Sequence, residues 1–385
     1  MTRPDRPPIR VLHIVGGMVR GGIETWLMHL LRQCDPKRFA MDFLVHTTEP
    51  CPYDEEVRQL GGRILPCLSP ARPWQYGQTF ASLVAEHGPY DILHSHVHQF
   101  NGFTLRCARR AGIPVRIAHS HVDTMPEDSA PGLARRMYIG VMRGLIGRHA
   151  THGLAASRLA AGALFPPDWA QDSRYRVLYY GIDLRPFHAA PEPGLRAELG
   201  LPADALVLGH TGRFEEQKNH AFLLEIAREA MAREPRARLL LIGAGSLRPA
   251  MERRAAELGI ADRVVFAGLR SDVPRVLLSA VDVFVLPSLC EGLGLVLVEA
   301  QAAGVPCVFS TNVPEEADVL PELVTRISLA TPAAQWAEAI LAGRGRPPLP
   351  RAEALARVEQ GPFNIRHSAA DLQSVYATAV GRPLV

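Results

Sequence analysis

Several features that would place a chain of this length in a particular class are absent. No stretch reaches 18 consecutive apolar residues, so no transmembrane helix is predicted. The N-terminal Met-Thr-Arg-Pro-Asp-Arg-Pro-Pro lacks the apolar core and cleavage site of a signal peptide, which predicts a cytoplasmic protein. The six cysteines form no CxxC pair and no zinc-binding spacing, so we interpret them as packing residues.

The chain also has little net charge. Its 42 Lys and Arg residues against 39 Asp and Glu residues give +3, which indicates no nucleic-acid partner. The distribution is uneven, because residues 1–190 hold 22 basic and 16 acidic residues while the remainder holds 20 and 23. A basic first half suits a phosphorylated acceptor or the inner face of an anionic cell membrane, and it is equally typical of a solvated surface. Both interpretations stay open.

Short apolar stretches alternate with helical patterns along the whole chain. In the first half the predicted strands are 9–15, 41–46, 64–67, 91–96, 115–121, 152–156 and 177–180. In the second half they are 206–211, 239–242, 264–267, 283–286, 306–309 and 324–328. Helical patterns lie between them, and this alternation predicts βαβ units with parallel sheets.

The predicted fold class is α/β, with two doubly wound Rossmann-like domains, because 385 residues exceed one ordinary core. The proline-rich stretch Pro186–Pro202 is the natural linker, which gives an N-terminal domain of residues 1–186 and a C-terminal domain of residues 187–363. Such sheets bind ligands outside the carboxyl ends of their strands. Two facing domains would therefore form an interdomain cleft.

One segment in the second half has the composition of an anion-binding site. It consists of a buried strand, a turn that carries Glu291, and a helix expected to begin near Gly294. The free backbone N–H groups of Leu293, Gly294 and Leu295 would attract a phosphate. Glu299 lies about two turns into the helix, so one carboxylate can reach a sugar and the other can accept hydrogen bonds from ribose hydroxyls.

This Glu-x7-Glu segment resembles the signature of the retaining glycosyltransferases of family 4, which have the GT-B fold. Residues 208–220, Leu-Gly-His-Thr-Gly-Arg-Phe-Glu-Glu-Gln-Lys-Asn-His, strengthen the resemblance. Arg213 and Lys218 match the arginine and lysine that grip the donor diphosphate in this family. Two cations at a strand end can neutralise a leaving nucleoside diphosphate as its charge develops.

The resemblance extends along most of the chain. The glycines of the loop after the first strand, Gly16, Gly17, Gly21 and Gly22, resemble the family's flexible glycine loop. Gly243 lies in a tight turn expected at the donor cleft, and Leu269 and Arg270 resemble the loop that reads the nucleotide base. The C-terminal segment 364–385 resembles the last helix of the family, which crosses back onto the first domain.

Histidines cluster after two strands of the first half. His94, His96 and His98 alternate, which predicts one strand face and gives a plausible metal spacing, but no Asp or Cys pattern accompanies them and we predict no metal. The family often has histidines lining the acceptor side of the cleft, which suits His96, His98 and His119; for His119 we prefer a role as a half-buried packing residue. By resemblance, His121 matches a histidine near the reacting sugar.

The resemblance implies retaining transfer from a nucleoside-diphosphate sugar, expected to be a UDP-sugar, to a hydroxyl of a glycan or lipid-linked glycan. Arg213, Lys218, Glu291 and His121 would be the catalytic residues. Segments 208–220 and 310–316 resemble enzymes of exopolysaccharide or capsule assembly. No Asp-x-Asp motif follows a strand, so the enzyme is expected to need no metal or other cofactor.

Two other functions and one localisation remain open from the sequence. One is a UDP-sugar epimerase of the same fold. The other is a non-catalytic partner that binds sugar nucleotides, against which the presence of all four residues Glu291, Glu299, Arg213 and Lys218 argues. The amphipathic segment 133–148 mixes arginines with large apolar residues. It is typical either of a helix that lies on a membrane surface or of a packed crossover helix.

Overall fold

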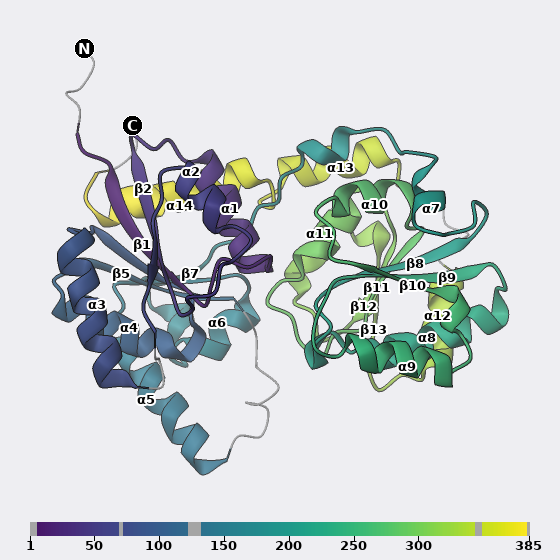
Figure 1. The fold of residues 1–385 in the computed structure, drawn as a ribbon, viewed down its shortest axis with the longest axis horizontal. Coiled ribbons are helices and arrows are strands. Elements are labelled where there is room, and N and C mark those ends of the chain that lie inside the picture. The colour runs from purple at the N-terminus through teal and green to yellow at the C-terminus, as the bar shows by residue number, and fades with distance from the viewer. Residues whose placement is uncertain (1–5, 69–71, 122–131, 343–348, 383–385) are drawn as a thin grey trace. The chain divides into compact units, whose positions relative to one another are not determined.

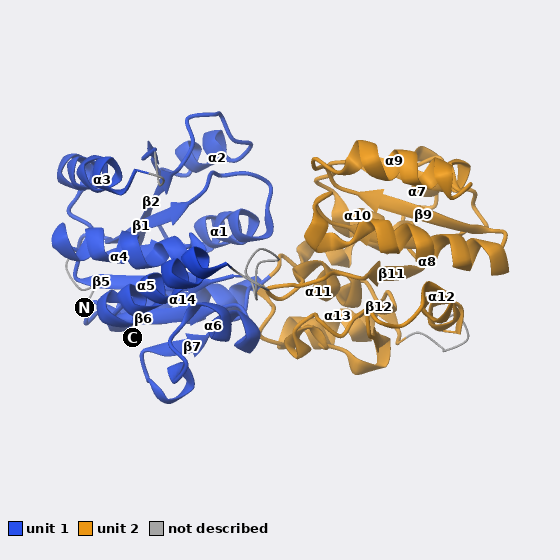
Figure 2. Cartoon of the chain, turned by 90° about the horizontal axis from the view of Figure 1, so that it is seen from below, with its two compact units in different colours: residues 1–181, 365–385 blue, residues 182–364 orange. Residues whose placement is uncertain are grey.

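The structure is a computed structural model that describes residues 6–68, 72–121, 132–342 and 349–382. The chain forms two compact units (Figure 2). Unit 1 consists of residues 1–181 and 365–385, and unit 2 consists of residues 182–364. Each unit has its own parallel sheet and its own hydrophobic core.

Unit 1 contains a seven-stranded parallel sheet in the order β3-β2-β1-β4-β5-β6-β7. The strands are β1 Ile9–Val15, β2 Phe39–Val45, β3 Ile64–Pro66, β4 Ile92–Ser95, β5 Val115–Ser120, β6 His152–Ala155 and β7 Tyr175–Val177. The order reverses between β1 and β4, which makes the carboxyl ends of these two strands the topological switch point. Ligands of doubly wound sheets bind at such points.

Helices cover both faces of this sheet (Figure 1). They are α1 Gly22–Gln33, α2 Asp54–Gln59, α3 Pro73–His87, α4 Asn101–Arg110, α5 Leu133–His149, α6 Arg158–Leu164 and α14 Ile365–Ala379. On one face α3, α4, α5 and α6 pack an apolar core that includes Leu12 and Ile14 of β1. Because alternate residues of a strand point to opposite faces, His13 lies on the other face, beneath α1 and α14.

Unit 2 contains a six-stranded parallel sheet in the order β10-β9-β8-β11-β12-β13. The strands are β8 Leu206–Thr211, β9 Ala237–Ile242, β10 Val264–Gly268, β11 Val283–Leu286, β12 Cys307–Ser310 and β13 Val324–Ile327. The helices are α7 Leu195–Glu198, α8 His220–Arg233, α9 Arg248–Glu257, α10 Val273–Ser279, α11 Leu295–Ala302, α12 Ala333–Ala342 and α13 Arg351–Gln360. The switch point of this sheet lies between β8 and β11.

The division of the chain differs from the predicted one at the first boundary. The chain passes between the units after Gly181, whereas the sequence placed the boundary after residue 186. The proline-rich stretch 186–202 lies in unit 2 and contributes to the 3-10 helix Arg185–His188 and to α7. Buried Phe187 and Leu195 anchor this stretch, so it is part of the unit rather than a linker. The C-terminal helix belongs to unit 1.

Within the described ranges, no helix is both long enough and apolar enough to cross a membrane.

Candidate functional site

Two loops of unit 2 meet at the carboxyl edge of its sheet. One follows β8 and the other follows β11, and these strands are neighbours at the switch point. Leu289 N donates to Gln217 O (2.9 Å), Gln217 Nε2 donates to Cys290 O (2.9 Å), and Asn219 Nδ2 donates to Pro287 O (3.1 Å). The segment with the predicted cations and the segment with the first predicted glutamate are therefore joined.

Lys218 and Glu291 form a direct ion pair between these loops. Lys218 Nζ lies 2.5 Å from Glu291 Oε1, and Ser288 Oγ donates to the same oxygen at 2.7 Å. Glu291 is only 5% exposed, so its carboxylate is stabilised by one cation and one hydroxyl rather than by bulk water. The two residues that the sequence assigned separately to the diphosphate and to the sugar are thus in contact.

Arg213 lies in the same loop as Lys218 but, unlike Lys218, is not paired with a carboxylate of the described residues. Its side chain is exposed and makes no ion pair or hydrogen bond with the described part of the chain. Gly212 precedes it, and a Cβ there would lie 3.0 Å from His210 Nε2 and 3.2 Å from the Lys218 side chain. The backbone and the Lys218 side chain therefore approach closely here, and the Arg213 guanidinium remains available for an anionic ligand.

Helix α11 begins at Leu295, so the prediction that it starts near Gly294 is confirmed. Gly294 adopts φ of 80°, in the left-handed region that favours glycine. The Leu293 side chain is buried, which fixes the backbone that leads into the helix. The first N–H groups of a helix have no partner within it, and at this edge they add a fixed positive dipole beside the ion pair.

Glu299 lies in the second turn of α11 and is half-buried. Burial raises the pKa of Glu299 from 4.5 to about 7, because the carboxylate loses hydration and gains no cation. A carboxyl group held in this state near neutral pH is typical of a functional position. That Glu299 accepts hydrogen bonds from the ribose hydroxyls of the donor stays a prediction.

Two buried histidines beside the ion pair had not been singled out from the sequence. His210 Nδ1 lies 2.9 Å from Val285 O, and its Nε2 has no hydrogen-bond partner in the described part of the chain. His220, the first residue of α8, stacks on Phe214 with ring centroids 4.2 Å apart, and neither of its nitrogens has a described partner. Burial lowers the pKa of His220 to about 4, so it is neutral. In the sequence, His210 lies two residues before Gly212 and His220 lies two residues after Lys218. This proximity to the predicted donor site was the signal that could have identified them.

The other predicted donor-side residues have local structural roles. Gly243 has φ of 146°, and a Cβ there would lie 2.0 Å from Gly212 O, so only glycine lets the loops after β8 and β9 meet. Arg270 lies 2.7 Å from Asp272 and 3.2 Å from Glu198. Its guanidinium is already paired, whereas the neighbouring Leu269 is exposed.

In unit 1 the predicted glycine loop connects β1 to α1. Gly21 is the residue before the helix and Gly22 is its first residue. A Cβ at Gly17 would lie 2.9 Å from the Thr47 side chain, whereas Gly16 and Gly22 have no atoms within 4 Å of such a Cβ. Close approach to a ligand is therefore geometrically open at Gly16 and Gly22.

The unit 1 histidines lie deeper than the acceptor-facing positions that the sequence suggested. His96, His119 and His121 are 7% exposed or less, because α1 and α14 cover this face of the sheet. His98 does not share the strand face of His96, since β4 ends at Ser95 and His98 starts a 3-10 helix with φ of 48°. His121 follows β5 directly, and both of its ring nitrogens have partners inside the unit.

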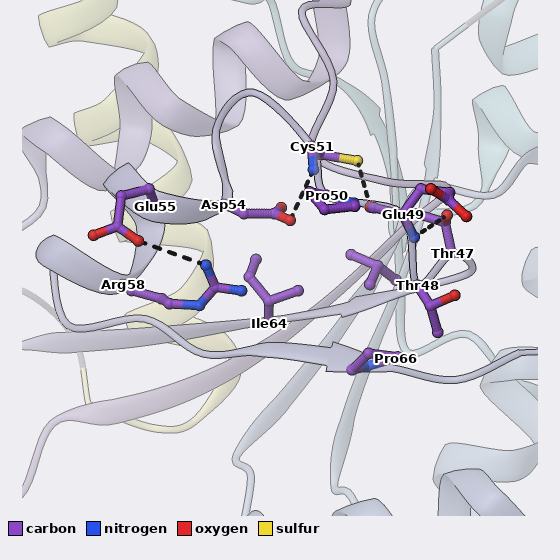
Figure 3. A pocket seen from close by; sticks show the side chains of 11 residues that line it. Thr47, Thr48, Glu49, Pro50, Cys51, Asp54, Glu55, Arg58, Ile64 and Pro66 are labelled. Carbon is purple, nitrogen blue, oxygen red and sulfur yellow. Dashed lines mark hydrogen bonds and ion pairs between the residues drawn. The ribbon is translucent and has the colours of Figure 1, made fainter.

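A cavity of about 310 Å³ with both polar and apolar lining residues opens in unit 1 at the carboxyl ends of β2 and β3, beside α2 (Figure 3). Thr47, Glu49, Asp54 and Arg58 are among its lining residues, and Asp54 Oδ2 accepts a hydrogen bond from Cys51 N (2.9 Å). None of the predicted site residues lines it. Its carboxylates and hydroxyls could accept hydrogen bonds from a hydroxylated ligand.

Comparison with known families gives two matches that together cover most of the chain. Residues 21–181 match the family described as glycosyl transferase 4-like domain, and residues 205–345 match glycosyl transferases group 1. EpsF of Bacillus subtilis (strain 168), which is named as a glycosyltransferase, is 40% identical over 346 residues, or 88% of this chain and 89% of EpsF.

The chain belongs to glycosyltransferase family 4. This confirms the predicted family and enzyme class, a glycosyltransferase that uses a nucleotide sugar, in preference to the epimerase and the non-catalytic partner.

Solved structures confirm the GT-B fold of this glycosyltransferase. HepE of Anabaena, solved with UDP and glucose, gives a TM-score of 0.78 at 19% identity and covers 96% of this chain and 100% of its own. Sucrose-phosphate synthase of Thermosynechococcus elongatus gives a TM-score of 0.77 at 22% identity and covers 98% of this chain and 100% of its own.

Proposed function

We propose that this glycosyltransferase transfers a sugar from a UDP-sugar, with retention of anomeric configuration, to a hydroxyl of a glycan or lipid-linked glycan in exopolysaccharide assembly. The observation that carries the donor half is the Lys218–Glu291 ion pair beside the exposed Arg213 and the start of α11. The relationship to EpsF and the UDP in the HepE structure support the choice of pathway and nucleotide.

In this proposal the cations act on the leaving diphosphate. Arg213 has no competing anion among the described residues, so it can bind a phosphate without breaking an existing pair. Lys218 is paired with Glu291, and its ammonium group has further N–H donors that can share its charge with a phosphate oxygen. These groups and the α11 dipole stabilise negative charge that grows as the sugar–phosphate bond breaks. They do so without a metal ion.

Glu291 would act on the sugar side of the same bond. Its carboxylate is buried and oriented by Ser288 and Lys218, so its charge is little screened by water. Positive charge grows on the anomeric carbon as the donor bond breaks, and an oriented carboxylate stabilises it. The acceptor hydroxyl attacks from the face that the diphosphate leaves. The phosphate takes the hydroxyl proton, so no enzyme nucleophile is required.

The acceptor half rests on unit 1. The cavity lined by Glu49 and Asp54 offers acceptors for sugar hydroxyls at the carboxyl edge of the first sheet.

Helix α5 offers a surface for peripheral contact with an anionic membrane. Leu133, Met137 and Val141 repeat every four residues and are 77%, 64% and 57% exposed. The same helix contains four arginines and no acidic residue, and Figure 1 shows its N-terminal part reaching beyond the other helices of unit 1.

The cations provide the direct test. With UDP-glucose as donor, UDP release by Arg213→Ala and by Lys218→Ala should each lose about 2–4 kcal/mol of transition-state stabilisation in kcat/KM. Arg228→Ala, which removes an exposed arginine of α8 away from the loops, should retain wild-type kinetics. Near-normal kcat/KM in either loop variant would contradict the proposed donor site. A β-linked product from an α-linked donor would contradict retention.

A further inference from the structure

Five histidines lie together between the unit 1 sheet and helices α1 and α14. They are His13 in β1, His94 and His96 at the end of β4, and His119 and His121 at the end of β5. These strands are parallel neighbours, and the alternating positions all point to the same face. Each of the five is 7% exposed or less, so every ring nitrogen needs a partner inside the protein.

With two tyrosines, these histidines form one continuous hydrogen-bonded chain. In order, the pairs are His13 Nδ1 with His96 Nε2 (3.0 Å), His96 Nδ1 with His121 Nε2 (2.7 Å), His121 Nδ1 with Tyr180 Oη, Tyr180 Oη with His119 Nε2 (3.3 Å), His119 Nδ1 with His94 Nε2 (2.9 Å), and His94 Nδ1 with Tyr376 Oη (2.6 Å). We call this the histidine–tyrosine chain. A hydroxyl both donates and accepts, so Tyr180 can join its two halves.

Hydrogen bonding explains this cluster better than a metal ion does. Two triads, His13–His94–His96 and His96–His119–His121, bring ligand atoms within 4.8 Å of one another. However, the ring nitrogens of the five are already paired within the chain, except for His13 Nε2, which has no partner in the described ranges. A cation would have to displace these bonds, and no carboxylate belongs to the chain to offset its buried charge.

The chain couples the tautomers of its members. Burial holds the pKa of each of the five histidines far below 6.5, at about 3 for His13 and His121, so all are neutral. A neutral imidazole has one donor nitrogen and one acceptor nitrogen. If His94 donates through Nδ1, every other member must donate through Nδ1 as well. In the reverse direction, in which Tyr180 donates to His121 Nδ1, all five donate through Nε2.

We propose that Tyr376 is a positioning residue for His121 and acts through the tautomer that the five histidines share. Tyr376 lies four hydrogen bonds from His121 along the chain, and its helix is at the other end of the sequence. Removing its hydroxyl leaves His94 Nδ1 without this partner, which changes the balance between the two directions and therefore which ring nitrogen of His121 donates. The link to catalysis rests on the proposed function and on the role that the resemblance predicts for His121, near the reacting sugar.

The shared tautomer can be tested without any substrate. In protein with ¹⁵N-labelled histidine, long-range ¹H–¹⁵N correlation spectra distinguish Nδ1–H from Nε2–H rings. We expect all five buried histidines, assigned from single His→Gln variants, to show the same tautomer. Mixed tautomers among the five would overturn the proposal, as would a stoichiometric metal ion found by elemental analysis of the purified protein.

A double-mutant cycle tests the route. Tyr376→Phe should shift the ring nitrogen resonances of His121, and Tyr180→Phe should cut the chain between them. In the Tyr180→Phe background, Tyr376→Phe should then leave His121 unchanged. Tyr76→Phe is the matched control, because Tyr76 is a buried tyrosine of unit 1 whose hydroxyl pairs with His46 (3.1 Å) outside the chain. Equal shifts at His121 in both backgrounds would show that Tyr376 acts through packing instead.

Turnover provides the functional readout. With UDP-glucose as the probe, Tyr376→Phe should lower kcat for UDP release by about threefold to tenfold and leave donor KM unchanged. An altered His121 tautomer with unchanged kcat would overturn the positioning role. If the wild-type protein releases no UDP, the proposed function fails, and the spectra still decide whether the chain exists.

Discussion

Replacing Glu299 with glutamine should stabilise the protein at pH 8 and weaken donor binding at the same time. Glu299 is half-buried in α11 between buried Val298 and Ala300, and burial raises its pKa to about 7. Ionisation of Glu299 therefore destabilises the folded state. Glutamine has nearly the same shape but no charge, so it removes this destabilisation. If the carboxylate binds ribose hydroxyls, the enzyme retains this cost for function.

The sign and size follow from proton linkage. Below pH 4.5, Glu299 is protonated in both the folded and the unfolded chain. Between pH 4.5 and 7 only the unfolded chain loses the proton, so the free energy of unfolding falls as pH rises, and it levels off above pH 7. The rise from 4.5 to about 7 corresponds to roughly 3 kcal/mol at about 1.4 kcal/mol per pH unit, an upper figure because the side chain retains some solvent contact.

Urea unfolding of wild type and Glu299→Gln at pH 4.5 and pH 8 checks this directly. The variant should gain up to about 3 kcal/mol at pH 8 and little at pH 4.5. Glu353→Gln, at an exposed carboxylate of α13 in the same unit, should show no such pH dependence. With UDP-glucose, Glu299→Gln should raise donor KM and change kcat less. An equal stability change at both pH values would refute the burial argument.

Three other predictions concern the reaction and its location. Glu291→Gln should lower kcat by about tenfold to a thousandfold, because an oriented charge acts mainly in the transition state; steady-state kinetics with an increase in KM alone would assign it to binding. Activity should survive EDTA, and complete loss restored by Mn²⁺ or Mg²⁺ would refute metal independence. Binding to anionic liposomes should be salt-sensitive and weakened by Met137→Glu in α5, while Leu159→Glu at an exposed site of α6 should have little effect; absence of co-sedimentation at low salt would remove membrane contact.

The parallel sheets could be predicted because their signals are local. β1, β8 and β11 have the predicted bounds, and the other predicted strands overlap observed ones, although the strand predicted at 177–180 shares only Val177 with β7. Gly294 likewise marks the start of α11, since a left-handed residue before a helix favours glycine. In contrast, the contact between Lys218 and Glu291 joins residues 73 positions apart, and its geometry depends on the order of β8 and β11 in the sheet. A spacing along the chain contains no information on that order.

The histidines show where the period of a strand stops being informative. Alternation correctly placed His94 and His96 on one face, but it could not show what covers that face. The cover includes Tyr376, which lies 282 residues from His94 in the sequence. His98 left the pattern because the strand ends before it and the backbone turns into a 3-10 helix. The predicted linker failed for a similar reason, since Phe187 is buried and its carbonyl accepts a hydrogen bond from Arg351, 164 residues away in unit 2.

The return of α14 to unit 1 has a consequence for synthesis on the ribosome. Unit 2 is one uninterrupted segment, so all of its residues are available once residue 364 has left the exit tunnel. Unit 1 begins first, but its histidine face lacks Ser368 and Tyr376 until α14 emerges. Nascent chains that fold from the N-terminus would wait in this state through the translation of the whole second unit. The unit that starts first is therefore the last to be completed, and a chain that stops before residue 365 leaves that face without its helix.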